Sequence, residues 1–212
     1  LMQNVGAKTE LTKAKTLAEA INKEVFRAIA LRSSWVRCAN SKDVLTAING
    51  AKLIAFNVIR EAIHKDLVFT MTKLFDVGKD DLSFHRIFRI LEDPAVLPLL
   101  ADAQACAEAN ARYRAVADSK HCRSLRLLRN KMLAHNDTRG VQQTAKYGHE
   151  VALLKDTVWI TTRLSTALPA GPFHYEAAER VWDDEANRFW MALIQGSGSA
   201  GKVLATDGFS QH

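Results

Sequence analysis

The sequence contains few residues that interrupt secondary structure and few that cross-link small folds. Of its 212 residues, four are proline, ten are glycine and three are cysteine. Proline and glycine disfavour helix interiors, so their scarcity favours a chain built of long helices. The cysteines are odd in number and lack a Cys-x-x-Cys pair, which argues against a disulfide framework and against a zinc knuckle. Free cysteines fit a reducing compartment, and we expect the protein to be cytoplasmic.

Long uncharged apolar runs are absent as well. No stretch reaches the roughly 18 apolar residues that a membrane-spanning helix needs, and no basic segment followed by an apolar core marks a secretory signal. Hydrophobic residues make up 48% and charged residues 25% of the chain, as in ordinary folded proteins. We therefore expect a single globular domain that is not associated with a membrane.

Apolar residues recur at the three- and four-residue spacing of helices. Residues 7–32 show the pattern of an amphipathic helix. Residues 41–75 are apolar on nearly every side, which predicts one long central helix unless Gly50 or a bend divides it. Asp81 or Ser83 is expected to cap a short helix, and a bend is expected near residues 118–119. The remaining expected helices cover residues 81–91, 98–117, 120–135, 149–168 and 176–195.

No sustained alternation of apolar and polar residues indicates a β-strand. The sequence therefore predicts an all-α fold, a single helical bundle of five to seven helices. The bundle is expected to occupy residues 1–195. The Gly/Ser-rich stretch that follows predicts a flexible C-terminal tail at residues 196–212.

Positive charge is concentrated in one segment. The chain has a net charge of +6, and its segment 112–131 has one acid, Asp118, against seven cations: Arg112, Arg114, Lys120, Arg123, Arg126, Arg129 and Lys131. Such a segment is either a surface that binds a nucleic-acid backbone or simply a solvated basic face. Tyr113 is the segment's only aromatic residue, so base-specific recognition by stacking is not expected.

The stretch LRLLRNKMLAHNDTRG, which starts at Leu125, combines leucines with polar residues that a core-facing helix does not need. On an ideal helix one stripe contains Leu125, Leu128, Met132 and His135. Arg129 lies about a third of a turn away from His135, so one straight helix does not bring the two side chains together. Either the helix ends early and turns His135 back, or the helices of two copies face each other.

Spacing alone favours an ordinary explanation of these residues. A histidine near the C-terminus of a helix often interacts with the exposed carbonyl groups there. An Arg-Asn pair on a helix is often a solvated edge. The complete sequence from Arg129 to His135 says more about function than the spacing of its residues does.

The string from Arg129 to His135 resembles the Arg-x(4–6)-His motif of the HEPN superfamily (higher eukaryotes and prokaryotes nucleotide-binding domains). Its continuation, His-Asn-Asp, resembles the abortive-infection and uncharacterised bacterial branches of that superfamily. The stretch DLVFTMTKLFD, residues 66–76, resembles a helix that precedes the motif in those proteins. The resemblance implies a HEPN-like helical bundle that commonly forms homodimers, so that two motifs share one cleft. Many such proteins are metal-independent endoribonucleases, so no metal or other cofactor is expected.

The resemblance also implies roles for the motif residues. Imidazole transfers protons near neutral pH, so His135 is expected to act in proton transfer. A guanidinium binds phosphate oxygens with two-pronged hydrogen bonds, so Arg129 is expected to bind the phosphate and stabilise its charge. Asn130 is expected to orient the phosphate or a neighbouring side chain. The expected contacts with the RNA backbone are Arg123, Arg126 and Lys131.

Two functions from different classes follow from this resemblance. The first is a HEPN-type ribonuclease that cleaves RNA by 2′-hydroxyl attack, as a toxin or phage-defence effector restrained by an antitoxin protein. The alternative is a non-catalytic HEPN-like module that binds nucleotide or RNA, or only dimerises. A DNA-binding regulator is less favoured, because no compact helix-turn-helix pattern is present.

Overall fold

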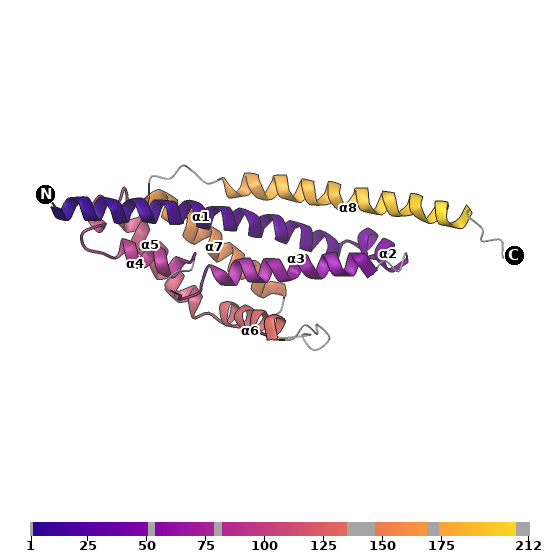
Figure 1. Ribbon diagram of the computed structural model, residues 1–212, viewed down its shortest axis with the longest axis horizontal. Helices are drawn as coiled ribbons and strands as arrows, with labels where there is room; N and C mark the ends of the chain where they lie inside the picture. Colours follow the sequence, from indigo (N-terminus) through magenta and orange to yellow (C-terminus); the bar gives the residue numbers. More distant parts are fainter. Residues whose placement is uncertain (1, 51–53, 79–81, 135–146, 169–173, 207–212) are drawn as a thin grey trace. The chain divides into compact units, whose positions relative to one another are not determined.

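The computed structural model describes residues 2–50, 54–78, 82–134, 147–168 and 174–206. Across these residues the chain forms eight α-helices and a single 3₁₀ turn, with no strand (Figure 1). The all-α prediction is confirmed. The α-helices are α1 (Met2–Asn40), α2 (Lys42–Gly50), α3 (Ile54–Lys73), α4 (Phe84–Leu91), α5 (Ala103–Ala117), α6 (Lys120–Ala134), α7 (Tyr147–Ala167) and α8 (Tyr175–Thr206).

The central apolar stretch at residues 41–75 forms two helices, α2 and α3, instead of one long helix. The last residue of α2 is Gly50. Glycine loses more conformational freedom than any other residue when it is held in a helix, so it is unfavourable in a helix interior. Figure 1 shows α2 at the turn between α1 and α3, which run in opposite directions. The alternative division at Gly50 is therefore the correct one. This division brings the number of helices above the predicted five to seven.

Two helices are longer than the sequence pattern predicts. The first helix continues past residue 32 to Asn40, and α8 continues past residue 195 to Thr206. Gly196 does not adopt the left-handed conformation that commonly ends a helix. The glycine at this position therefore does not stop α8 where the composition suggested.

The chain divides into two compact units, which share α1 and α3. Unit 1 comprises Leu1–Ala28 with Leu67–Tyr175, and unit 2 comprises Ile29–Asp66 with Glu176–His212. In unit 2, Trp190 is fully buried with Cys38 and Phe56, and its indole Nε1 donates to the carbonyl oxygen of Ser34 at 3.2 Å. These contacts hold α8 against the end of α1 and the start of α3.

Unit 1 contains the predicted motif. Its helices α5 and α7 pack closely against each other. The buried rings of Phe75 and Phe84 lie 5.3 Å apart, and those of Phe88 and Tyr113 lie 5.4 Å apart. This aromatic cluster joins the end of α3 to α4 and α5, which fixes the surroundings of the following helix, α6.

Local capping signals determine where the helices of unit 1 begin. The Ser83 hydroxyl caps α4, as predicted, and accepts from the Arg86 backbone N–H at 3.4 Å. The alanine-rich helix begins later than predicted, because the Asp102 carboxylate caps it by accepting from the Ala105 N–H at 2.9 Å. The bend predicted near residues 118–119 is confirmed, since α5 ends at Ala117 and α6 begins at Lys120. Because of this bend, α6 does not continue along the axis of α5.

In the described part of the chain, no helix combines the length and apolar character needed to cross a membrane. Cys38, Cys106 and Cys122 are all buried and free of disulfide bonds.

Candidate active site

Helix α6 presents two different faces. Cys122, Leu125 and Leu128 are buried, which confirms the apolar stripe predicted for this segment. Exposed side chains occupy the opposite face: Lys120, Arg123, Leu127, Asn130 and Lys131. This exposed set is called the α6 outer face below.

Arg129 lies between these faces and is largely covered. Its side chain is 18% exposed, and its Nη1 donates to Oδ2 of Asp76 at 2.6 Å. Asp76 follows the end of α3, 53 residues earlier in the chain. The Nε of Arg129 is buried and has no hydrogen-bond partner in the described part of the chain. The guanidinium is therefore held at one nitrogen while another donor is still unused.

Arg126 points into the same region instead of into solvent. Its Nη2 donates to the backbone carbonyl of Phe75, and its Nη1 lies 3.5 Å from the carbonyl oxygen of Ala117. Its Nε is 4.0 Å from Oδ1 of Asp76. Arg126 thus ties the end of α3 to the end of α5. The sequence predicts a contact with RNA for Arg126. In the structure two of its nitrogens donate to backbone carbonyls, and its buried Nε has no hydrogen-bond partner among the described residues.

The structure therefore gathers Arg126, Arg129 and Asp76 into one group, which is called the Arg126–Arg129–Asp76 cluster below. Asp76 is not among the site residues that the sequence predicts, because its position suggested only a loop. A clue was present, since Asp76 ends the stretch at residues 66–76 that resembles a helix preceding the motif. Only the folded chain shows which arginines this carboxylate contacts.

Three of the other predicted site residues are not part of this cluster. Asn130 is exposed, about 100° around the helix from Arg129. Arg123 and Lys131 are also exposed on the α6 outer face. His135 lies outside the described residues and follows Ala134, the last residue of α6. The predicted end of the helix, within a turn of His135, also lies outside the described residues.

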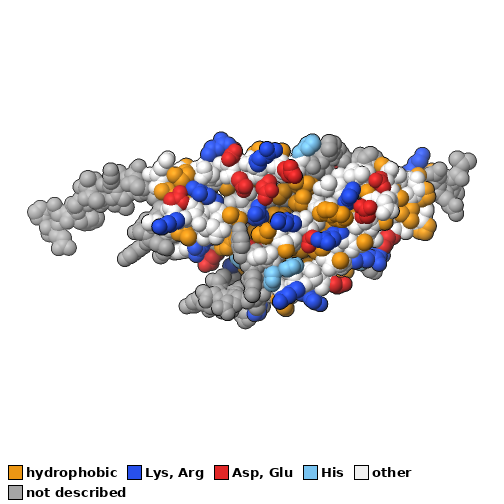
Figure 2. Space-filling model, turned by 180° about the vertical axis from the view of Figure 1, so that it is seen from behind, with side chains coloured by type: hydrophobic (Ala, Val, Ile, Leu, Met, Phe, Trp, Pro, Cys, Tyr) orange, Lys and Arg blue, Asp and Glu red, His pale blue; other side chains and the backbone are white. Residues whose placement is uncertain are grey.

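The seven cations of segment 112–131 differ in their surroundings. Arg112 donates from Nε to Asp156 at 3.0 Å, Arg114 pairs with Glu92, and Arg126 and Arg129 share Asp76. Among the described residues, no acid pairs with Lys120, Arg123 or Lys131. Figure 2 shows Lys and Arg side chains interspersed with Asp and Glu on the face that it presents. The segment is therefore less positive in the fold than in the sequence.

The buried groups beside the cluster are kept neutral. Burial raises the pKa of the Cys122 thiol, although the nearby guanidinium of Arg126 acts in the opposite direction. Burial likewise raises the pKa of the Tyr113 hydroxyl. A thiol acts as a nucleophile in its ionised form, so Cys122 is not suited to nucleophilic catalysis. Within the described residues no three His, Cys, Asp or Glu side chains gather in a way that could hold a metal ion.

Comparison with known proteins identifies the family to which the chain belongs. The family model described as AbiU2, an HEPN family, matches residues 8–189. The match includes the Arg126–Arg129–Asp76 cluster and the string that ends at His135. Neither the curated proteins nor the solved structures contain a significant match. Because the matched region covers most of the chain, the protein belongs to the AbiU2 family of HEPN proteins, which is associated with abortive infection.

Proposed function

We propose that this protein is a metal-independent endoribonuclease of the HEPN type. In the proposed reaction the ribose 2′-hydroxyl loses its proton to a base and its oxygen attacks the adjacent phosphorus. The bond from phosphorus to the 5′-oxygen then breaks, and that oxygen takes up a proton. The products are a 2′,3′-cyclic phosphate and a 5′-hydroxyl. His135 transfers the protons, and Arg129 binds the phosphate.

The observation that carries this proposal is the state of the Arg129 guanidinium, which Asp76 holds in place through only one of its nitrogens. Its Nη1 is fixed on Asp76 at 2.6 Å, and its buried Nε has no hydrogen-bond partner among the described residues. The side chain is 18% exposed, so a phosphate oxygen would accept charge-assisted hydrogen bonds from the other N–H groups of the guanidinium. The arrangement supports a preorganised arginine that stabilises negative charge as it develops.

A homodimer would complete the proposed site. Arg129 and the helix position that His135 would occupy lie about a third of a turn apart, so a second copy is a natural source of the partner motif. Leu127 and Leu133 of α6 are 57% and 66% exposed. Large exposed apolar side chains next to the motif support pairing of two chains there. Asn130, which is also exposed, would then orient the phosphate or the opposing motif.

Membership of an abortive-infection-associated family supports a biological role for the cleavage. We infer that the protein is a toxin or phage-defence effector of the cytoplasm, and that an antitoxin protein restrains it. Its three buried free thiols suit a reducing compartment.

Replacement of the proposed base tests the proposal. We expect wild-type protein to cleave single-stranded RNA in EDTA, and His135→Ala to lose at least about 100-fold in rate, the typical contribution of general acid–base catalysis. His174, which is exposed in unit 1, supplies the matched control His174→Ala, which should cleave normally. Circular dichroism and thermal unfolding would establish that both variants fold. Full activity of folded His135→Ala would remove His135 from the mechanism.

A second candidate function has an observation in its favour. The ion pair between Arg129 and Asp76 has the form of a structural contact, which suits a non-catalytic module that uses the motif for dimerisation or nucleotide binding. In that case wild-type protein cleaves no RNA, and Arg129→Ala weakens the dimer in sedimentation experiments. The cleavage assay separates the two functions.

A further inference from the structure

A hollow of about 380 Å³ lies beside the Arg126–Arg129–Asp76 cluster, between α4, α5 and the loop after α3. We propose that it binds one nucleotide of single-stranded RNA next to the scissile phosphate, with Arg89 holding a flanking phosphate. The proposal rests on the proposed function, because it places the substrate of the same site. It adds a binding residue on α4, away from the motif.

Arg126 connects the hollow with the cluster. Its side chain lines the hollow, and its Nε lies 4.0 Å from Asp76, the carboxylate that also holds Arg129. Arg126 and Arg129 are three residues apart and therefore share one side of α6. The α6 outer face points elsewhere, with Lys131 about 160° around the helix from Arg129. A strand with its phosphate on Arg129 therefore has this hollow on the same side of α6, next to Arg126.

Arg89 is the cation of the hollow that is available to a ligand. Arg114 pairs with Glu92, whose carboxylate also accepts from Asn110 at 2.6 Å, and Arg126 is bonded to the end of α3. Arg89 is exposed, and no acid among the described residues pairs with it. A guanidinium that pairs with no acid of the described residues suits a phosphate, which it can bind through two parallel hydrogen bonds.

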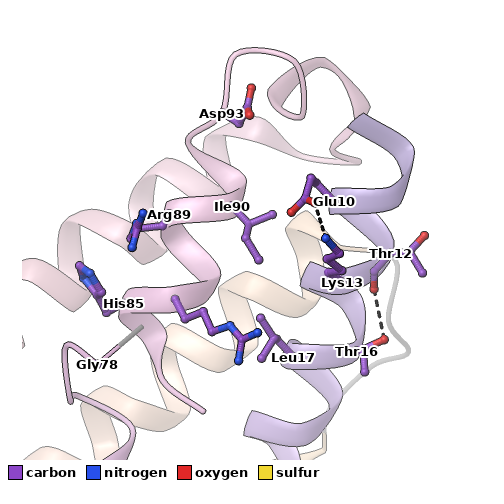
Figure 3. Close-up of a pocket in the computed structure, with 11 residues that line it drawn as sticks. Glu10, Thr12, Lys13, Thr16, Leu17, Gly78, His85, Arg89, Ile90 and Asp93 are labelled. Carbon is purple, nitrogen blue, oxygen red and sulfur yellow. Dashed lines mark hydrogen bonds and ion pairs between the residues drawn. The ribbon is translucent and has the colours of Figure 1, made fainter. Parts of the chain in front are cut away.

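His85 accompanies Arg89 one turn earlier on α4. Figure 3 shows the two side chains together on one side of the helix, while Ile90 faces α1. Both residues also line a second hollow, of about 580 Å³, between α4 and α1. There the cation of α1, Lys13, is held by Glu10 at 2.6 Å, and the hollow does not include Arg126. The first hollow is therefore the better continuation of the proposed site.

The size and walls of the first hollow suit a single nucleotide. A volume of about 380 Å³ lies near the lower end of the range for small-molecule pockets. The rings of Phe88 and Tyr113 form part of its wall, and Val77, which is 65% exposed, stands at its edge. The lining combines these apolar groups with polar ones, among them the amide of Asn110 and the carboxylates of Glu92 and Asp118. These polar groups offer hydrogen-bond partners to an unstacked base, as single-stranded RNA presents it, while Arg89 binds the phosphate.

Binding of an uncleavable strand tests the inference independently of catalysis. The probe is a fluorescent 2′-O-methyl single-stranded RNA, measured by anisotropy. Arg89→Ala, which removes the phosphate contact, and Val77→Asp, which puts a negative charge at the edge of the hollow, should each raise Kd about 10-fold, the size of one charge-assisted contact. The control Arg188→Ala removes the same charge from an exposed site in unit 2 and should change Kd less than about twofold.

A base scan gives the second readout. Removing one base of the probe at a time should weaken binding to the wild type most at a single position, and Arg89→Ala should shrink that position's penalty, because contacts within one pocket are coupled. Unchanged Kd in both hollow variants, or a base-scan profile that Arg89→Ala leaves intact, would overturn the inference. RNA cleavage by the wild type is a separate measurement. Its absence would refute the proposed function, while the binding experiment would still test whether the hollow binds a nucleotide.

Discussion

Asp76 gives the Arg126–Arg129–Asp76 cluster its geometry. Its two oxygens face two arginines of α6, with Oδ2 at 2.6 Å from Arg129 and Oδ1 at 4.0 Å from Arg126. The carboxylate and the guanidiniums are each less than one-third exposed, so solvent screens their interaction less than it screens surface pairs. In the proposed mechanism Asp76 is a positioning residue, because it acts on RNA only through Arg129.

Removing the charge of Asp76 should therefore impair both catalysis and folding. We expect Asp76→Asn to lower the cleavage rate about 10- to 100-fold, as misplacement of a catalytic group does, and to destabilise the fold by about 1–3 kcal/mol. Rates at saturating RNA and urea unfolding would measure the two effects.

Asp156→Asn is the matched control for that variant. It removes the partner of Arg112, a cation on the same unit whose side chain is 53% exposed. The partner of Asp156 is Arg112 and not a residue of the Arg126–Arg129–Asp76 cluster, so this variant should cleave RNA at the wild-type rate. Equal loss of activity in both variants would show that charge in general, and not the position of Arg129, controls the reaction.

At the scale of elements, basic residues on the two faces of α6 have different surroundings and therefore different proposed roles. The outer face exposes Arg123 and Lys131 without acidic partners among the described residues, whereas Arg126 and Arg129 point toward Asp76. We propose that Arg123 and Lys131 attract RNA by their charge, while the cluster positions the scissile phosphate.

Salt dependence distinguishes the outer face from the hollow. The double variant Arg123→Ala/Lys131→Ala should lower the slope of log K against log salt by about 1.4, since each phosphate contact to a single strand contributes about 0.7. Its base-scan profile should keep the wild-type shape. An unchanged slope would show that these two residues do not contact RNA.

Dimerisation through α6 leads to another expectation for this element. Leu133 is 66% exposed, and a charge in its place would have to be desolvated in a dimer interface. Leu133→Asp should therefore shift the protein toward monomer in analytical ultracentrifugation and lower RNA cleavage in parallel. The monomer should remain folded, because Leu133 is outside the core. Cleavage at the wild-type rate by a pure monomer would contradict a shared site.

Sequence periodicity predicts α6 itself but not its partners. The apolar stripe through Leu125 and Leu128 and the bend at residues 118–119 are local signals, and both are confirmed. Whether Arg123 or Arg126 turns inward depends on Asp76 and Phe75. These two residues are about fifty positions earlier in the sequence, and the aromatic cluster of unit 1 holds them beside α6. Likewise, the apolar residues of 41–75 indicate burial, but they do not show that the chain reverses after Gly50.

At the scale of the whole molecule, buried ionisable groups couple stability to alkaline pH. Burial raises the pKa of Cys38 and of Cys106 from 9.0 to about 11, and it raises the pKa of Tyr175 as well. Between pH 9 and 11 the thiols of the unfolded chain lose their protons, while those of the folded chain keep them. The free energy of unfolding should therefore fall as pH rises through this window.

Guanidinium unfolding at pH 8 and at pH 10.5 measures this change. Cys106→Ala isolates one thiol, because other groups also titrate at high pH, and the small residue suits the alanine-rich helix α5. The variant should lose less stability than the wild type between the two pH values. An equal loss in both proteins would show that Cys106 does not contribute to the pH dependence.

The central claim is that the protein cleaves RNA by attack of a ribose 2′-hydroxyl, with no metal taking part. The most direct measurement compares, in EDTA, a single-stranded RNA with the same strand carrying one 2′-deoxy nucleotide at the mapped cleavage site. We expect the RNA to be cut to a 2′,3′-cyclic phosphate and the substituted strand to stay intact at that site while remaining cleavable elsewhere. Cleavage at the 2′-deoxy position, or activity that requires added metal, would contradict the account.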